Sequence, residues 1–166
     1  MYRITQCLSV GRFPGAERAA DLRAAGVTHV LNVSGTPNVL TAGDGGLRAV
    51  AWHPLDDSRR LSAPTACAIL DALHAMAADP GAHVYVHCAA GQLRGPTVLW
   101  LYLIACGYDA DSARAVIETR SPDAAPGPRR MVGPDLIPRV QMHGLAHYFP
   151  HPRGEALVPF GTDGSS

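Results

Sequence analysis

The sequence contains no lysine. All fourteen of its basic residues are arginine, and fourteen acidic residues balance them, so the formal net charge at pH 7 is zero. A neutral chain has no general attraction to nucleic acid or to acidic membranes, and we expect neither as a partner. Together with 17 glycines, 14 prolines and many alanines, the missing lysine is typical of GC-rich coding and predicts a bacterial origin.

Long apolar runs are also missing. No stretch has the length of a transmembrane helix, and the N-terminal segment MYRITQCLSVGRF lacks the basic residues and apolar run of a secretory signal. We therefore expect no membrane insertion and a cytoplasmic location. The 166 residues suffice for one buried core, and we predict one domain over residues 1–149 and a flexible tail over 150–166.

Patterns of metal ligands are absent as well. The four cysteines form no CxxC pair and show no zinc-ligand spacing. Cys7, Cys67 and Cys106 lie within apolar strand or helix patterns, where packing is the expected role. His143 and His147 are four residues apart on a predicted helix, but no third ligand accompanies them, so we expect an ordinary helix surface. We predict neither a metal ion nor another cofactor.

Strands alternate with helices along the chain. Runs of β-branched and apolar residues such as THVLNV predict strands, and Ser62 and either Asp109 or Asp111 are candidate helix N-caps. The run PTVLWLYLIAC is apolar on every side, begins with proline and ends before glycine, which predicts a buried central helix. The order predicts an α/β fold, a central, mostly parallel sheet flanked by helices, with ligands at the carboxyl ends of its strands. We expect strands at 6–10, 28–33, 47–52 and 83–88, and helices at 15–26, 63–79, 96–106, 109–120 and within 136–149.

The segment VHCAAGQLRGPT, residues 86–97, joins the last predicted strand to that central helix. A turn of small residues can curl its amide groups, here those of residues 89–94, around an anion at a positive helix end. Such a nest would stabilise a Cys88 thiolate, and Arg94 would offer a planar fork of donors to a tetrahedral oxyanion. The predicted chemistry is metal-free attack on phosphorus through a phosphocysteine. The alternative is a buried structural cysteine in a strand-to-helix turn.

Protonation of a leaving oxygen would require an acid near that nest. The loop WHPLDDSRR follows a predicted strand and carries Asp56 and Asp57. Loops that follow parallel strands share one edge of the sheet, so a carboxyl group of this loop could reach over the nest. An ordinary solvated turn explains the same residues.

These segments resemble the cysteine-dependent protein phosphatases, and most closely their small, atypical dual-specificity branch. VHCAAGQLRGPT is similar to the His-Cys-x-x-Gly-x-x-Arg signature of that family. HPLDD resembles its acid loop, in which a proline precedes the acid by three residues, and this spacing matches Asp57 and not Asp56. Residues 4–35 resemble the opening strand, helix and second strand, and TVLWLYLIACG resembles the helix behind the signature. The likeness extends from residue 2 to about residue 120.

The resemblance implies a strand–phosphate loop–helix active site, with Cys88 as nucleophile, Arg94 as phosphate clamp and Asp57 as general acid. His87 would orient the loop and support the ionised thiol, and Thr97 matches a common family position. The phosphate cradle would consist of the backbone amides of Ala89, Ala90, Gly91, Gln92 and Leu93, together with Arg94. The partner would be a phosphorylated protein or peptide that carries phosphotyrosine, with phosphoserine and phosphothreonine as further candidates.

One position departs from the family pattern, because Gly95 stands where a serine or threonine hydroxyl usually helps the sulfur to leave. Loss of such a donor costs about 100-fold or more in rate, so we expect phosphoryl transfer to Cys88 to persist and hydrolysis of the phosphoenzyme to slow. The alternatives are a slow or inactive phosphate-binding pseudophosphatase and a phosphatase for small molecules or lipids. The loop lacks the lysines of the inositol-lipid phosphatases, which weighs against lipids. Arg59 and Arg60 could border the mouth and favour acidic peptides, although a solvated turn explains them more simply.

Overall fold

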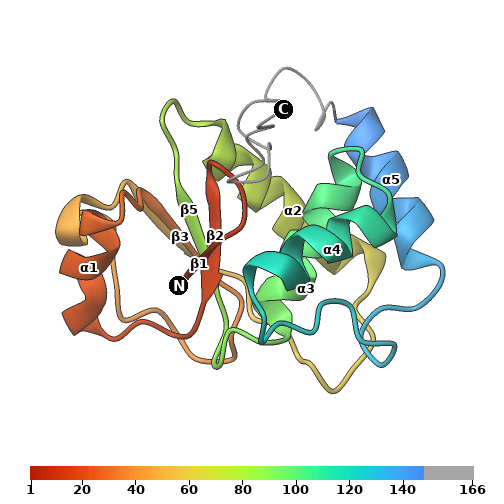
Figure 1. The fold of residues 1–166 in the computed structure, drawn as a ribbon, viewed down its shortest axis with the longest axis horizontal. Helices are drawn as coiled ribbons and strands as arrows, with labels where there is room; N and C mark the ends of the chain where they lie inside the picture. The colour runs from red at the N-terminus through yellow and green to blue at the C-terminus, as the bar shows by residue number, and fades with distance from the viewer. Residues whose placement is uncertain (148–166) are drawn as a thin grey trace.

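Five strands form a single sheet with the order β1-β2-β5-β3-β4 (Figure 1). In the computed structural model, which describes residues 1–147, β2, β5, β3 and β4 run parallel, and β1 pairs antiparallel with β2 at one edge. The predicted α/β fold with a mostly parallel sheet is confirmed, whereas the predicted tail over 150–166 lies outside the described residues. β1 was not predicted, because two residues are too few to show a pattern. The strands are β1 Tyr2–Arg3, β2 Leu8–Gly11, β3 His29–Asn32, β4 Ala49–Trp52 and β5 Val84–His87.

The register of the sheet aligns the carboxyl ends of the four parallel strands. His87, the last residue of β5, pairs with Gly11 of β2 on one side and with Asn32 of β3 on the other, and Asn32 pairs with Trp52 of β4. The loops that follow these strands therefore leave the sheet at the same edge. Since β5 is the middle strand, the loop after His87 lies between the loops that follow β2 and β3.

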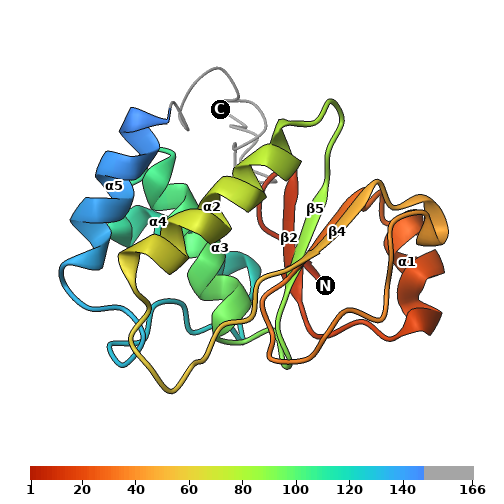
Figure 2. The ribbon, with the colours of Figure 1, turned by 180° about the vertical axis from the view of Figure 1, so that it is seen from behind.

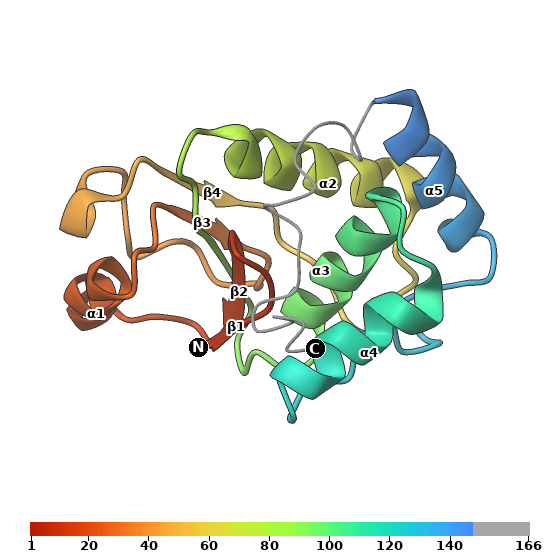
Figure 3. The ribbon, with the colours of Figure 1, turned by 45° about the horizontal axis from the view of Figure 1, so that its top comes forward.

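Helices cover both faces of the sheet. One face carries α1 and the short 3-10 segments η1 and η2, and the other carries α2, α3, α4 and α5 (Figure 1, Figure 3). Each layer has its own hydrophobic core, and the smaller one joins Leu22 of α1 to Val30 of β3 and Tyr85 of β5. The helical segments are η1 Ala16–Arg18, α1 Ala19–Ala24, η2 Asp44–Gly46, α2 Ala63–Ala78, α3 Arg94–Ala105, α4 Ala110–Arg120 and α5 Leu136–Ala146.

Helix α3 is the central helix that its apolar sequence predicts. It packs against α2, α4 and α5 (Figure 2), and every residue from Gly95 to Ala105 is buried. The predicted start at Pro96 is wrong, because the helix begins at Arg94 and the proline is its third residue. A proline is tolerated there since the first four amides of a helix have no intrahelical acceptor. Neither α3 nor any other helix within residues 1–147 is long and apolar enough to cross a membrane.

Side chains cap the two helices for which caps were predicted. The Ser62 side chain accepts a hydrogen bond from the amide of Thr65 at the start of α2. At the start of α4 the cap is Asp109 and not Asp111, because Asp109 accepts a hydrogen bond from the amide of Ser112. Both helices therefore begin where the capping residues of the sequence indicate.

Candidate active site

Cys88 is the first residue after β5, at the edge where the parallel strands end. All four residues of β5 are buried between β2 and β3, and Cys88 itself is only 2 % exposed. Residues 88–93, here called the phosphate loop, then lead directly into α3. A rigid buried strand and a rigid buried helix therefore hold the two ends of this loop.

Backbone contacts tie the carbonyl groups of the phosphate loop to the segments around it. The Ala89 carbonyl accepts a hydrogen bond from the amide of Phe13 at 3.0 Å, and the Gln92 carbonyl accepts one from the amide of Ala125 at 2.8 Å. Within the part of the chain that the structure describes, no backbone carbonyl accepts a hydrogen bond from the amides that follow Cys88 in this loop. Occupied carbonyls and available amides are the features of an anion-binding nest.

Gly91 lets the phosphate loop pass close to the segment that follows β2. Its φ angle is +76°, and a Cβ atom there would lie 2.5 Å from the Gly11 carbonyl carbon and 2.9 Å from the Arg12 amide nitrogen. A residue with a side chain would be strained by the backbone angle and would also collide with backbone atoms that cannot turn aside. The loop therefore requires glycine at this position.

Arg94 connects the phosphate loop to residues 53–62, here called the acid loop. Its Nη1 donates a hydrogen bond to the Leu55 carbonyl at 3.2 Å, and its Nε lies 4.0 Å from Oδ2 of Asp57. The Arg94 side chain is 16 % exposed. The fold thus brings a guanidinium group and a carboxyl group together beside the phosphate loop, although they are distant in the sequence.

The two neighbouring carboxyl groups of the acid loop have different partners. Oδ1 of Asp56 accepts hydrogen bonds from the Ser58 amide at 2.9 Å and from the Ser58 hydroxyl at 2.6 Å. These bonds hold the pKa of Asp56 below its ordinary value, and its Oδ2 lies 3.2 Å from Nε of Arg59. Asp56 is therefore a poor proton donor that stabilises the turn. The carboxyl group that lies beside Arg94 is that of Asp57.

The segment between α4 and α5 supports the acid loop. Nε of Arg130 donates a hydrogen bond to the Asp57 carbonyl at 2.9 Å, and the Leu61 amide donates one to the Met131 carbonyl at 2.7 Å. The sequence analysis missed both contacts. No local signal could have indicated them, because they depend on how two distant segments meet at the sheet edge.

His87 contacts the backbone of the phosphate loop as a neutral side chain. Burial lowers its pKa to about 4, and its Nδ1 donates a hydrogen bond to the Cys88 carbonyl at 3.3 Å, since a carbonyl can only accept. The ring centroid lies 5.0 Å from that of Phe13 and 5.7 Å from that of Tyr85. The backbone contact is suited to orienting the loop, whereas support for the ionised thiol stays a prediction.

The Thr97 hydroxyl is used inside the protein. It donates its proton to the Leu93 carbonyl at 2.6 Å and accepts a hydrogen bond from the Gly127 amide at 2.9 Å. This arrangement ties the end of the phosphate loop to the first turn of α3 and to the segment after α4. In the observed rotamer, Thr97 has no proton left to donate to the Cys88 sulfur.

Gly95 faces the start of the phosphate loop. A Cβ atom at this position would lie 3.8 Å from the Cys88 amide nitrogen and 3.1 Å from Cγ2 of Val10. A hydroxyl attached there would be next to Cys88, which is the position where the family pattern has serine or threonine. Gly95 therefore lacks a hydroxyl at a position from which it could reach Cys88.

The other cysteines and the paired histidines lie outside this site. Cys7 and Cys106 are buried and Cys67 is partly buried, and burial raises the pKa of Cys106 to about 12. Nε2 of His143 lies 2.6 Å from a carboxylate oxygen of Asp71. Among residues 1–147, no three side chains of the metal-ligating types are grouped together.

The chain matches a family model described as "Swiss Army Knife protein, DSP-PTPase phosphatase domain" over residues 5–132. No curated protein sequence matches the chain. Among similar crystal structures is PTPMT1 in complex with PI(5)P, with 17 % identity, a TM-score of 0.71 and coverage of 88 % of this chain and 97 % of that one. Human DUSP28 has 22 % identity and a TM-score of 0.63, with coverage of 89 % and 98 %. The human tyrosine phosphatase-like serine/threonine/tyrosine-interacting protein has 16 % identity and a TM-score of 0.66, with coverage of 89 % and 97 %.

These structures share the fold of the chain, and at such low identities they show no more than that. The family match shows more than the fold, since residues 5–132 make up most of the sequence and include the acid loop, the phosphate loop and Arg94. The chain belongs to the DSP-PTPase phosphatase domain family, within the small dual-specificity-like branch of the cysteine phosphatases.

Proposed function

We propose that this dual-specificity-type phosphatase domain hydrolyses phosphate monoesters on protein side chains, with phosphotyrosine as the main substrate, through a phosphocysteine at Cys88. The observation that carries the proposal is the position of Asp57, whose carboxylate lies 4.0 Å from Arg94 at the mouth of the phosphate loop. Nucleophile, phosphate clamp and acid are the three groups that this chemistry needs, and each comes from a different segment at one edge of the sheet.

In the first step, the Cys88 thiolate attacks the phosphorus of a substrate held by the loop amides. The S–P bond forms while the bond from phosphorus to the leaving oxygen breaks, and Asp57 gives its proton to that oxygen. Arg94 and the amides of the phosphate loop balance the negative charge on the other three phosphate oxygens.

In the second step, water attacks the phosphocysteine, and the Asp57 carboxylate accepts a proton from that water. The S–P bond breaks, Cys88 leaves as a thiolate, and inorganic phosphate is released. Gly95 supplies no donor to the leaving sulfur, and the Thr97 hydroxyl donates to Leu93. We therefore propose that this step limits turnover. The second candidate is a phosphate-binding pseudophosphatase, in which hydrolysis of the phosphocysteine is too slow for catalytic turnover.

Rapid-mixing hydrolysis of p-nitrophenyl phosphate tests the proposal, with Cys88→Ser and Asp57→Asn beside the wild type. We expect a burst of nitrophenol followed by slow turnover, with the burst absent in Cys88→Ser and slowed in Asp57→Asn. Steady turnover without a burst would mean that the second step is not limiting. A burst with no turnover after it, or no release above the Cys88→Ser control, would rule out catalytic turnover of this substrate and leave the pseudophosphatase.

The substrate class needs a separate comparison, because a structural neighbour, PTPMT1, was crystallised with PI(5)P. We measure kcat/KM for phosphotyrosine, phosphoserine and phosphothreonine peptides and for PI(5)P in mixed micelles. The proposal requires a phosphotyrosine peptide to be the best of these substrates. A higher kcat/KM for PI(5)P would replace the protein substrate with a lipid while leaving the roles of Cys88, Arg94 and Asp57 unchanged.

A further inference from the structure

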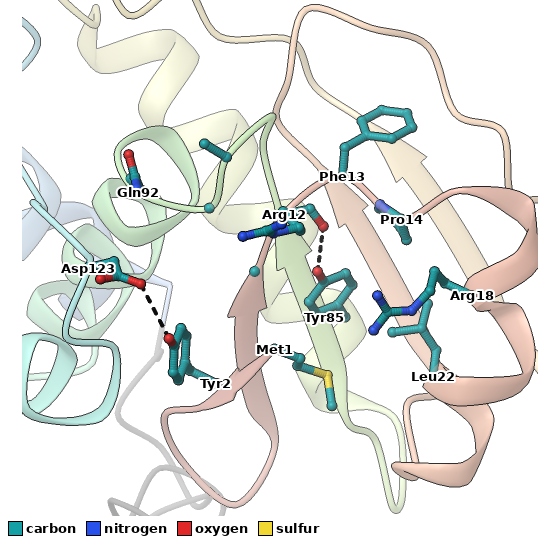
Figure 4. Close-up of a pocket in the computed structure, with 13 residues that line it drawn as sticks. Met1, Tyr2, Arg12, Phe13, Pro14, Arg18, Leu22, Tyr85, Gln92 and Asp123 are labelled. Carbon is teal, nitrogen blue, oxygen red and sulfur yellow. Dashed lines mark hydrogen bonds between the residues drawn. The ribbon is translucent and has the colours of Figure 1, made fainter.

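A pocket of about 270 Å³ lies beside the phosphate loop (Figure 4). Ala90, Gly91 and Gln92 of that loop line one side of it, and the segment that follows β2 lines another. Because β2 and β4 lie on opposite sides of β5, this pocket is separated from the acid loop by the phosphate loop itself. The mechanism proposed above does not use it.

Two arginines reach into this pocket. Arg12 comes from the segment after β2 and Arg18 from η1, and Figure 4 shows their side chains on two sides of Tyr85. Burial raises the pKa of Tyr85 to about 12, while both guanidinium groups act in the opposite direction. Both positive charges therefore act on the part of the pocket around Tyr85. The Tyr85 hydroxyl donates its own proton to the Arg12 carbonyl.

Acidic side chains leave most of these donors available. Nε of Arg18 lies 3.0 Å from Oδ2 of Asp21, in a pair whose two side chains are both largely exposed. The guanidinium group of Arg12 makes no hydrogen bond or ion pair with any residue in the range 1–147. Asp123, at the rim of the pocket, accepts a hydrogen bond from the Tyr2 hydroxyl at 3.3 Å. The pocket is thus lined by two exposed guanidinium groups with unused N–H groups, and their positive charge attracts an anion.

We propose that this pocket is a second oxyanion site, which binds a phosphate group separately from the nest at Cys88. Two guanidinium forks suit the several acceptor oxygens of a phosphate dianion better than a single carboxylate. A Cβ atom at Gly91 would lie only 2.9 Å from the Arg12 amide nitrogen, so the two sites are separated by little more than one backbone segment. The ligand is either a second phosphate group on a substrate held at Cys88 or free inorganic phosphate.

Calorimetric titration with inorganic phosphate tests the site without relying on turnover. We use the full chain with Cys88→Ser, at constant ionic strength, and expect two bound phosphates per chain. Adding Arg12→Gln and Arg18→Gln should leave only the phosphate at the phosphate loop. Adding Arg94→Gln instead should leave only the phosphate in the pocket. Arg23→Gln removes an arginine of α1 that does not line the pocket and should leave both. A single phosphate that is lost with Arg94→Gln and unaffected by the double change would overturn the proposal.

Two peptides of the same sequence, with one or two phosphotyrosines, distinguish the sources. If the second phosphate belongs to the substrate, the doubly phosphorylated peptide binds about 10- to 100-fold more tightly, the gain typical of charge-assisted bonds. That gain should disappear with Arg12→Gln and Arg18→Gln. Equal affinities together with two bound inorganic phosphates identify free phosphate as the ligand. A gain that survives the double change would place the second phosphate elsewhere and contradict the site. Absent turnover would contradict only the proposed function, since neither measurement depends on catalysis.

Discussion

Replacing Gly95 by serine would put a hydroxyl beside Cys88, and we expect this change to accelerate hydrolysis of the phosphoenzyme. The Cβ position of residue 95 lies 3.8 Å from the Cys88 amide nitrogen, which is close enough for a hydroxyl to turn toward the sulfur. A donor directed at developing negative charge contributes about 100-fold to a rate. The Val86 carbonyl, 3.6 Å from the same Cβ position, is a competing acceptor, so about 100-fold is the upper end of the expected gain.

The substitution should be tolerated by the fold. The new Cβ atom would lie 3.1 Å from Cγ2 of Val10, so this methyl group must move by a few tenths of an ångström, which costs about 1 kcal/mol. Removing a glycine from a helix stabilises the folded state by about 0.5–1 kcal/mol. Because the two effects nearly cancel, the melting temperature should change by only about 2 °C.

Rapid-mixing kinetics with p-nitrophenyl phosphate separate the two chemical steps. In Gly95→Ser the rate of the initial burst should stay near that of the wild type. The rate of the slow phase should rise toward the burst rate, and the burst amplitude should decrease. Gly95→Ala is the matched control, because it adds the same Cβ atom without the hydroxyl. A slow phase equally fast in Gly95→Ala and Gly95→Ser would refute the reasoning, since the gain would then come from packing.

Three further changes test other parts of the site. Gly91→Ala should cost about 2 kcal/mol or more of stability and abolish activity, because its Cβ atom would collide with backbone; thermal melting and p-nitrophenyl phosphate turnover measure both. Arg130→Gln should lower the burst rate about 10-fold by releasing the acid loop, and Arg129→Gln is the control. If Arg130→Gln lowers the burst rate further in an Asp57→Asn background, this role is contradicted. His87 has a pKa of about 4 when folded against 6.5 in the unfolded chain, so only the unfolded chain takes up its proton between these values. The contribution of His87 to stability should therefore be complete above pH 6.5 and fall by about 3 kcal/mol toward pH 4. Denaturant titrations should show a flatter dependence of stability on pH in His87→Phe than in the wild type, and an equally steep dependence would contradict this reasoning.

Much of the fold and part of the site could be predicted from local patterns. Strands and helices alternate with a clear change of hydrophobic period, so the α/β class and the buried α3 followed from the sequence. Cys88 and Arg94 are only six residues apart, at the start of the phosphate loop and the start of α3, so their proximity follows from the local chain alone. The start of α3 was predicted two residues late, because Pro96 is acceptable anywhere in the first turn and does not mark its first residue.

The sequence by itself supplied the candidate residues and their chain order, and the resemblance of HPLDD to the acid loop of the family favoured Asp57 over Asp56. Only the tertiary structure decided which distant segments meet. The strand order places the acid loop on one side of the phosphate loop and Arg12 on the other, and contacts such as that of Arg130 with Asp57 follow from this placement. The physical reason is that a local pattern reports which face of a strand or helix is buried, whereas strand order and register arise from packing between elements far apart in the chain.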